Sequence, residues 1–203
     1  MQRYHEIVTD QLSLSIWLER NSRANRMRHF EKLLRLFPFS QREQGQSTIS
    51  IQAVDSTEPP LLERPVNGPV DASEVLEIFS EYKGEDVAYW LESWWDLWQF
   101  QGGDWILAPA RVGLASFGPE FDNGTERAML DQEDLRIDFG VDTHYLPQTE
   151  LGGGARLTES NIKSLLRLVH ELDATLPVLK RTLETESGEN FAGRLQHVLR
   201  SSS

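Results

Sequence analysis

The chain of 203 residues contains no cysteine. That absence excludes disulfide bridges, thiolate zinc sites, iron–sulfur clusters and cysteine nucleophiles. No stretch reaches the roughly 18 consecutive apolar residues that a membrane-spanning helix needs, so we expect no contact with a membrane. The first nine residues also lack the apolar segment of a secretion signal, and we therefore expect a cytoplasmic protein.

The short motifs that fix a reaction are missing as well. The sequence has no serine nucleophile elbow, His-Glu-x-x-His pair, phosphate-binding loop, dinucleotide glycine fingerprint or EF-hand loop. The run Gly152-Gly153-Gly154 lacks the Gly-Lys-Ser/Thr ending of a phosphate loop and indicates a flexible joint. We therefore expect no cofactor and no bound metal, and the sequence favours a role other than catalysis.

Positive charge is scarce in the middle of the chain. Twenty basic and 32 acidic residues give a net charge of -12. Residues 46–160 hold 6 basic and 22 acidic side chains, a net charge of -16, whereas the flanking segments are weakly basic. Proteins bind nucleic acids and anionic lipids by neutralising phosphates with Lys and Arg. The acidic middle is therefore not expected to bind nucleic acid, and a basic protein or a second copy of the chain is the partner that we expect.

The first 55 residues predict a strand, a helix and a second strand. Apolar and polar residues alternate between Gln11 and Glu19, which is typical of a half-buried strand. From Asn21 to Phe37 apolar residues recur at helical spacing, and Pro38 ends that helix. Alternation returns between Ile49 and Ala53. We expect the basic side chains near the helix mostly on its solvated side: Arg23, Arg26, Arg28, Lys32 and Arg35.

Residues 56–71 contain four prolines and no periodicity, which predicts a linker. It would join two halves of a single domain, residues 1–55 and residues 72–175. Asp71 is a suitable N-cap for a short helix that reaches Tyr82.

Residues 86–100, DVAYWLESWWDLWQF, hold four of the six tryptophans. Aromatic residues favour pleated surfaces, and Gly102-Gly103 is typical of a hairpin turn, so we interpret this segment as a strand. A helix with Trp90, Trp94 and Trp98 at four-residue spacing is the alternative. The return strand runs from Trp105 to Phe117, and Pro109 predicts an edge or a bulge there.

The remaining segments predict one more strand and several helices. Residues 135–145 alternate clearly, and a helix begins at Thr158 or Ser160. Residues 176–200 predict a C-terminal helical segment, with one helix after Pro177 and a last one around Phe191. The whole chain, residues 1–203, therefore predicts a single α+β domain in which helices pack on one face of an antiparallel sheet. Two ferredoxin-like halves are the finer form of this prediction.

The second faces of these strands predict a binding surface. If the strands share one sheet, their alternate residues form a surface opposite the helices. Tryptophan offers flat, rigid contact area, and carboxylates attract cations. The residues that we expect to bind a partner are Trp17, Trp90, Glu92, Trp94, Asp96, Trp98, Trp105, Arg111 and Arg136. An inhibitor or immunity-type protein that caps a basic protein is one concrete version, and a binder of carbohydrates or other small molecules is an alternative. Loops, helices or a second copy that cover these tryptophans would leave no such surface.

Asp138, Asp142 and His144 suggest a second function class. They are spaced two or four residues apart on one predicted strand face. A carboxylate and a histidine in this arrangement can perform general acid–base chemistry or share a metal ion. The alternative hypothesis is therefore a hydrolase that uses these three residues.

Overall fold

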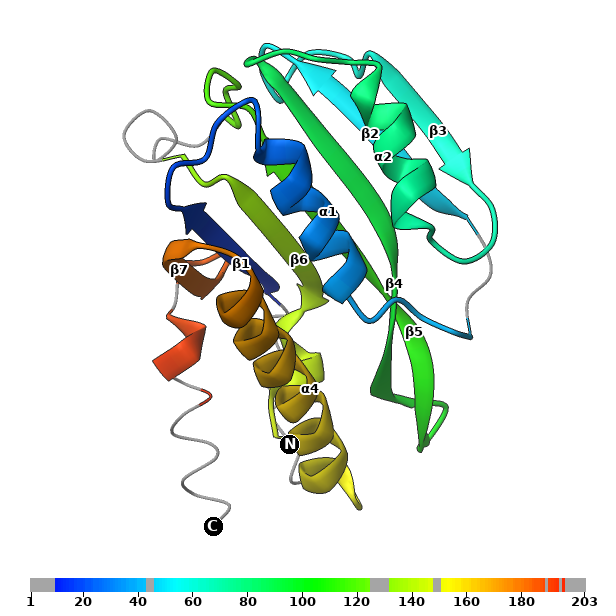
Figure 1. Ribbon diagram of the computed structural model, residues 1–203. Helices are drawn as coiled ribbons and strands as arrows, with labels where there is room; N and C mark the ends of the chain where they lie inside the picture. Colours follow the sequence, from blue (N-terminus) through cyan, green and yellow to red (C-terminus); the bar gives the residue numbers. More distant parts are fainter. Residues whose placement is uncertain are drawn as a thin grey trace.

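The computed structural model describes residues 10–42, 46–124, 132–147, 151–188, 190–193 and 195. Seven strands of these residues form one antiparallel sheet in the order β3-β2-β4-β5-β6-β1-β7 (Figure 1). The strands are β1 (Gln11–Leu18), β2 (Ser47–Ala53), β3 (Leu62–Val66), β4 (Val87–Gln101), β5 (Asp104–Phe117), β6 (Leu135–Val141) and β7 (Val178–Thr185). The helices are α1 (Arg26–Leu36), α2 (Ala72–Ser80), the 3-10 helix η1 (Asp142–Tyr145) and α4 (Gly154–Thr175).

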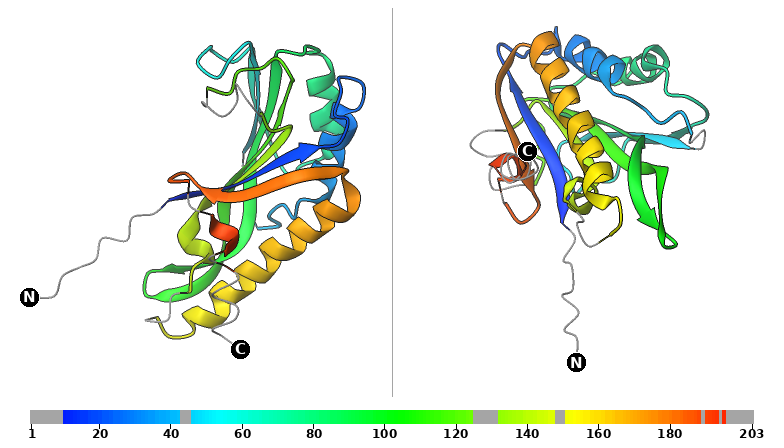
Figure 2. Two further views of the ribbon diagram at one scale, coloured as in Figure 1. Left: turned by 90° about the vertical axis from the view of Figure 1, so that its left-hand side faces the viewer. Right: turned by 90° about the horizontal axis from the view of Figure 1, so that it is seen from below.

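The main core lies between the sheet and one layer of helices, as expected for the α+β class. Figure 2 shows α1, α2 and α4 on the same side of the sheet. The apolar residues of β1 alternate with polar ones and are buried beneath this layer, together with Phe30 of α1 and Phe79 of α2. No helix in the described part of the chain is long and apolar enough to cross a membrane.

The tryptophan-rich segment is a strand, and the helical alternative is wrong. Strand β4 pairs with β5 in an unbroken register that runs from Ala88 opposite Phe117 to Gln101 opposite Asp104. Gly102 and Gly103 form the turn with φ values of 63° and 91°, a conformation that glycine adopts without steric cost. The register keeps every alternate residue of β4 away from the helices.

The expected linker over residues 56–71 is wrong in part, because it contains the edge strand β3. This strand pairs with β2 from Ser47 opposite Val66 to Ile51 opposite Leu62. Pro65 is tolerated because an edge strand needs hydrogen bonds on one side only. Strands from both expected halves join one continuous sheet, and its strand order does not divide into two ferredoxin-like units.

The helix expected after Pro177 is also wrong. Residues 178–185 form the strand β7, which pairs with β1 from Leu12 opposite Thr185 to Leu18 opposite Val178. Pairing with the edge of β1 outweighs the weak helical spacing of this short segment. Residues 191–193 and 195 are helical, and the rest of the expected last helix lies outside the described residues.

Helix α4 begins earlier than expected, at Gly154. Thr158 does not cap the helix, because its hydroxyl donates to the carbonyl of Gly154 within the first turn. The glycine run therefore ends where the helix starts, and Gly153 precedes it with a φ of 79°.

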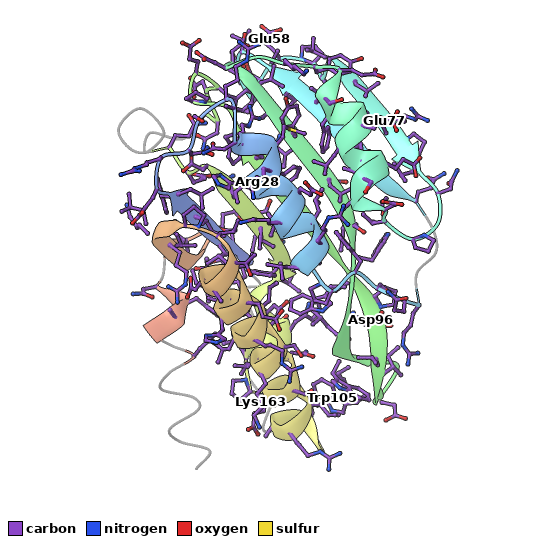
Figure 3. The ribbon with its side chains drawn as sticks, in the orientation of Figure 1. Arg28, Glu58, Glu77, Asp96, Trp105 and Lys163 are labelled. Carbon is purple, nitrogen blue, oxygen red and sulfur yellow. The ribbon has the colours of Figure 1, made fainter. Side chains whose placement is uncertain are left out.

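Arg26 does not lie on the solvated side of α1, where the basic residues of this helix are expected. Its side chain is buried and donates to the carbonyls of Val87 and Ser116 at 2.6 and 2.8 Å. The guanidinium also lies 4.3 Å from the centre of the Tyr89 ring, and burial lowers its pKa to about 10. Arg26 thus ties α1 to the ends of β4 and β5, whereas Arg28 lies on the exposed side of the helix (Figure 3).

Candidate functional site

The side of the sheet that faces away from α1, α2 and α4 is called the open face below. Strand pairing fixes which residues are neighbours on it. One row crosses all seven strands: Pro65, Thr48, Glu92, Gly113, Asp138, Ser13 and Glu184. The adjacent row contains Glu63, Ser50, Trp90, Ala115, Arg136, Ser15 and Thr182.

The strand alternation places every residue of the predicted binding set on this side of its strand. They differ in exposure, however. Trp17 is only 6% exposed, and the ammonium of Lys180 on β7 lies 4.2 Å from the centre of its ring. Because β7 was expected to be a helix, its contact with Trp17 was not foreseen. Trp17 therefore contributes little accessible surface.

A second, small apolar cluster covers one end of the open face. It consists of Ala88, Ala115, Phe117 and Phe121, with Trp90 packed against it. The Trp90 ring meets Phe117 edge-on at a centroid distance of 5.3 Å. Arg136 pairs with Glu133, and its guanidinium lies 5.3 Å from the centre of the Phe117 ring. Trp90 and Arg136 thus both hold this end of the fold together.

The other end of the open face is formed by an arm, which comprises residues 93–112 of the β4–β5 hairpin. The arm extends past the last residues that pair with β2 and β6 (Figure 1). On its helix side Trp95 and Leu97 are buried in the main core. Its opposite side carries five large apolar residues that belong to neither apolar cluster: Trp94, Trp98, Phe100, Trp105 and Leu107. Trp105 marks the far end of the arm in Figure 3.

Side chains from other elements hold the arm in place. The amide of Trp98 donates to Asn161 Oδ1 of α4, and Asn161 Nδ2 donates back to the Trp98 carbonyl, both at 2.9 Å. The Asp96 carboxylate accepts hydrogen bonds from the Ser40 hydroxyl at 2.6 Å and from the Gln41 amide at 3.2 Å. The backbone beneath the aromatic residues is therefore fixed. Asp96, a predicted binding residue, therefore already takes part in hydrogen bonds that stabilise the fold.

The ion pair between Glu92 and Arg111 separates two depressions in the centre of the open face. The first has a volume of about 460 Å³ and is lined by Gln46, Thr48, Glu92, Ser93, Trp94 and Arg111. The second has a volume of about 250 Å³ and is lined by Gln11, Trp90, Glu92, Arg111, Val112, Gly113, Asp138 and Gly140. The predicted binding residues Trp90, Glu92, Trp94 and Arg111 thus surround two shallow cavities of a size that admits a side chain.

Asp138 is the most perturbed acid of the open face. Its half-buried carboxylate lies over Gly113, where an added Cβ would be 3.3 Å from Asp138 Oδ2. Burial raises the pKa of Asp138 to about 6, and the charge of Arg136 offsets this only in part. Among the described residues it has no hydrogen-bond or ion-pair partner. Asp138 belongs to the three residues of the hydrolase hypothesis and not to the predicted binding set.

The structure does not place Asp142 and His144 on the strand with Asp138, so this expectation is wrong. Strand β6 ends at Val141, after a bulge at Gly140 with a φ of 74°. Asp142 is buried in η1 and accepts a hydrogen bond from the Asp10 amide at 3.2 Å. His144 follows in the same turn, and burial lowers its pKa against the opposing charge of Asp142. Within the described ranges no group of three acidic or histidine residues is arranged to hold a metal ion.

Two contributors to the site were missed by sequence reasoning. Asn161 lies on the buried side of α4, where a polar residue among apolar ones is a signal of a buried hydrogen bond. Gly113 creates the gap beneath Asp138, and a lone glycine in a strand indicates close approach by another group. Both signals are present in the sequence, but the sequence alone does not show which residues Asn161 and Gly113 contact.

Comparison with known proteins gives no relative for this chain. No protein-family model matches it, and no curated protein or solved structure is significantly similar.

Proposed function

We propose that this protein is a non-catalytic binding protein whose open face captures a basic protein partner, with Trp94 and Trp98 as central contact residues. One observation carries the proposal. On the helix side of the arm Trp95 and Leu97 are buried in the main core, whereas the aromatic residues of its other side belong to neither apolar cluster. Grouped aromatic side chains outside the core are costly in water, and they commonly mark binding sites.

The rigidity of the arm supports this function. Trp98 is fixed through its backbone by Asn161, and the Trp94 indole donates to the Gln46 carbonyl at 3.4 Å. Binding therefore orders little additional backbone, which lowers the entropic cost of association. Tryptophan residues held in this way are frequent among the contacts that contribute most to affinity.

Charge favours a basic partner over an acidic one. Glu92, Asp96 and Asp138 lie on or beside the open face, and Arg111 is already paired with Glu92. Residues 46–160, which include β2 to β6, carry a net charge of -16. A field of this sign accelerates encounter with a basic protein and disfavours acidic competitors. An inhibitor or immunity-type protein that caps a basic enzyme is one form of this function.

The experiment compares the wild-type chain with the double variant Trp94→Ala/Trp98→Ala as bait for partner capture. The matched control is Leu61→Ala/Leu179→Ala, which removes two apolar side chains that are 56% and 68% exposed elsewhere on the surface. Captured proteins are identified by mass spectrometry, and the affinity of each purified candidate is then measured by calorimetry. We expect basic proteins in the captured set. Because one central tryptophan contributes about 2 kcal/mol or more, the double variant should bind at least about a hundredfold more weakly.

Three results would contradict the proposal. The first is equal binding of the captured partner by wild type and by a folded Trp94→Ala/Trp98→Ala variant. The second is a wild-type dimer in solution that this variant converts to a monomer, because a second copy would then cover the face. The third is a saturable change in tryptophan fluorescence with neutral sugars and none with the captured proteins, which would favour the carbohydrate alternative.

A further inference from the structure

The second depression of the open face is lined by Asp138, an acid that forms no ion pair with any residue the structure describes. Asp138 has neither a hydrogen bond nor an ion pair within the described part of the chain. The two nearest cations of this face are engaged elsewhere, because Arg111 pairs with Glu92 and Arg136 pairs with Glu133. An unpaired carboxylate in a partly desolvated position costs the folded state free energy. No hydrogen bond or ion pair of the described residues therefore accounts for an acid at this position.

Two glycines line the depression that contains this carboxylate. Gly113 lies directly opposite Asp138 in the register, and a Cβ there would contact Asp138 Oδ2. Gly140 lines the same depression, and a Cβ there would be 3.1 Å from the Arg111 carbonyl. Both glycines line this cavity of about 250 Å³.

Trp90 forms a wall of the depression beside Asp138. Its indole Nε1 is buried and has no hydrogen-bond partner among the described residues. A ligand that fits this site must therefore present a cation to Asp138 and an apolar or planar surface to the Trp90 side chain. A basic amino-acid side chain has both, in its charged head and in its apolar stem.

We propose that this depression receives an arginine side chain of the partner, whose guanidinium pairs with Asp138 and lies against the Trp90 ring. The inference rests on the proposed function and names the chemistry that the partner must present. Arginine fits better than lysine for two reasons. Its planar fork matches a carboxylate in a bidentate way, and it stacks on aromatic rings at a lower desolvation cost than an ammonium.

The test uses N-acetyl-arginine amide and N-acetyl-lysine amide as probes, added to the ¹⁵N-labelled full-length protein. The six tryptophan indole N–H signals are followed by NMR, and the Trp90 signal is assigned with a Trp90→Phe variant. We expect a saturable shift of the Trp90 signal with the arginine probe, and binding that is at least about tenfold weaker with the lysine probe.

The variant Asp138→Asn should weaken binding of the arginine probe at least about tenfold, because the charge-assisted hydrogen bonds are lost. Gly113→Ala, which places a methyl group against the Asp138 carboxylate, should weaken binding of the arginine probe as well. Glu63→Gln is the matched control: Glu63 is an exposed carboxylate in the row next to Asp138, and its loss should leave binding unchanged.

The assignment of arginine is overturned if the Trp90 signal does not move, if both probes bind equally, or if Asp138→Asn binds as the wild type does. These results are separate from the capture experiment, which depends on Trp94 and Trp98. Loss of capture in the arm variant together with a silent Trp90 signal would refute this inference and leave the proposed function intact. If the arginine probe binds but the wild-type chain captures no basic protein, the arginine site is supported and the proposed function is refuted.

Discussion

Replacing Asp138 by asparagine should stabilise the protein at neutral pH and much less under acidic conditions. The carboxyl group is half-buried over Gly113 and lacks a partner among the described residues, so its ionised form is poorly solvated. Asparagine has nearly the same shape and carries no charge. The substitution therefore removes the cost of desolvating a carboxylate while it leaves the packing of β5 and β6 almost unchanged.

The magnitude follows from the pKa of Asp138, which is about 6 in the folded protein against an ordinary value of 3.8. A folded-state pKa above the unfolded one means that folding favours the protonated form. The contribution of this pKa difference to the free energy of unfolding is complete below the pKa of the unfolded state, and it is lost as the pH rises through the pKa of the folded state. The full difference corresponds to about 3 kcal/mol, of which about 2 kcal/mol develops between pH 4.5 and 7.5.

Urea unfolding, followed by tryptophan fluorescence at each pH, measures this effect. The free energy of unfolding of Asp138→Asn minus that of the wild type should increase by about 2 kcal/mol between pH 4.5 and 7.5. The control Glu63→Gln, which removes an exposed carboxylate, should show a difference that changes little with pH. A difference for Asp138→Asn that stays constant, or that falls as the pH rises, would refute the reasoning, because the ionised carboxylate would then be well solvated or paired.

Two further substitutions test the contacts that support the open face. Arg26→Met should lower the free energy of unfolding by about 3 kcal/mol, because it strands buried carbonyls, whereas Arg28→Met on the exposed side of α1 should change it by less than about 0.5 kcal/mol in urea titrations. Asn161→Ala should accelerate hydrogen exchange of the Trp98 amide at least about tenfold, and Ser160→Ala should not. An unchanged exchange rate would show that α4 does not hold the arm.

The acid at position 138 links stability to the proposed function. Residues that are costly to the fold and have no partner within it are typical of sites that bind something else. A cation from a partner would remove the cost that asparagine removes, and the same substitution would abolish the pairing. Gain of stability and loss of binding in a single variant would therefore be the signature of this site.

Strand alternation was sufficient to predict the central elements and the direction of their side chains. The pattern of β4 requires alternate residues to lie on opposite faces, so Trp94 and Trp98 had to leave the helix side once the segment was extended. Edge strands are harder to recognise. Strand β3 contains a proline, and the residues of β7 show weak helical spacing. Both segments are strands because each pairs with one neighbouring strand, and neither carries along its whole length the alternating burial that would reveal a strand in the sequence.

The amino-acid sequence by itself determined the class of this fold, the extended form of its tryptophan-rich segment and the identity of the side chains opposite the helices. These are local consequences of a two-residue period, which each strand carries in its own residues. Tertiary structure alone decided that Lys180 covers Trp17, that Asn161 fixes Trp98 and that Asp138 lies against Gly113 beside a cavity. Such contacts join residues far apart in the chain, and their existence depends on strand order and register, which no single segment encodes.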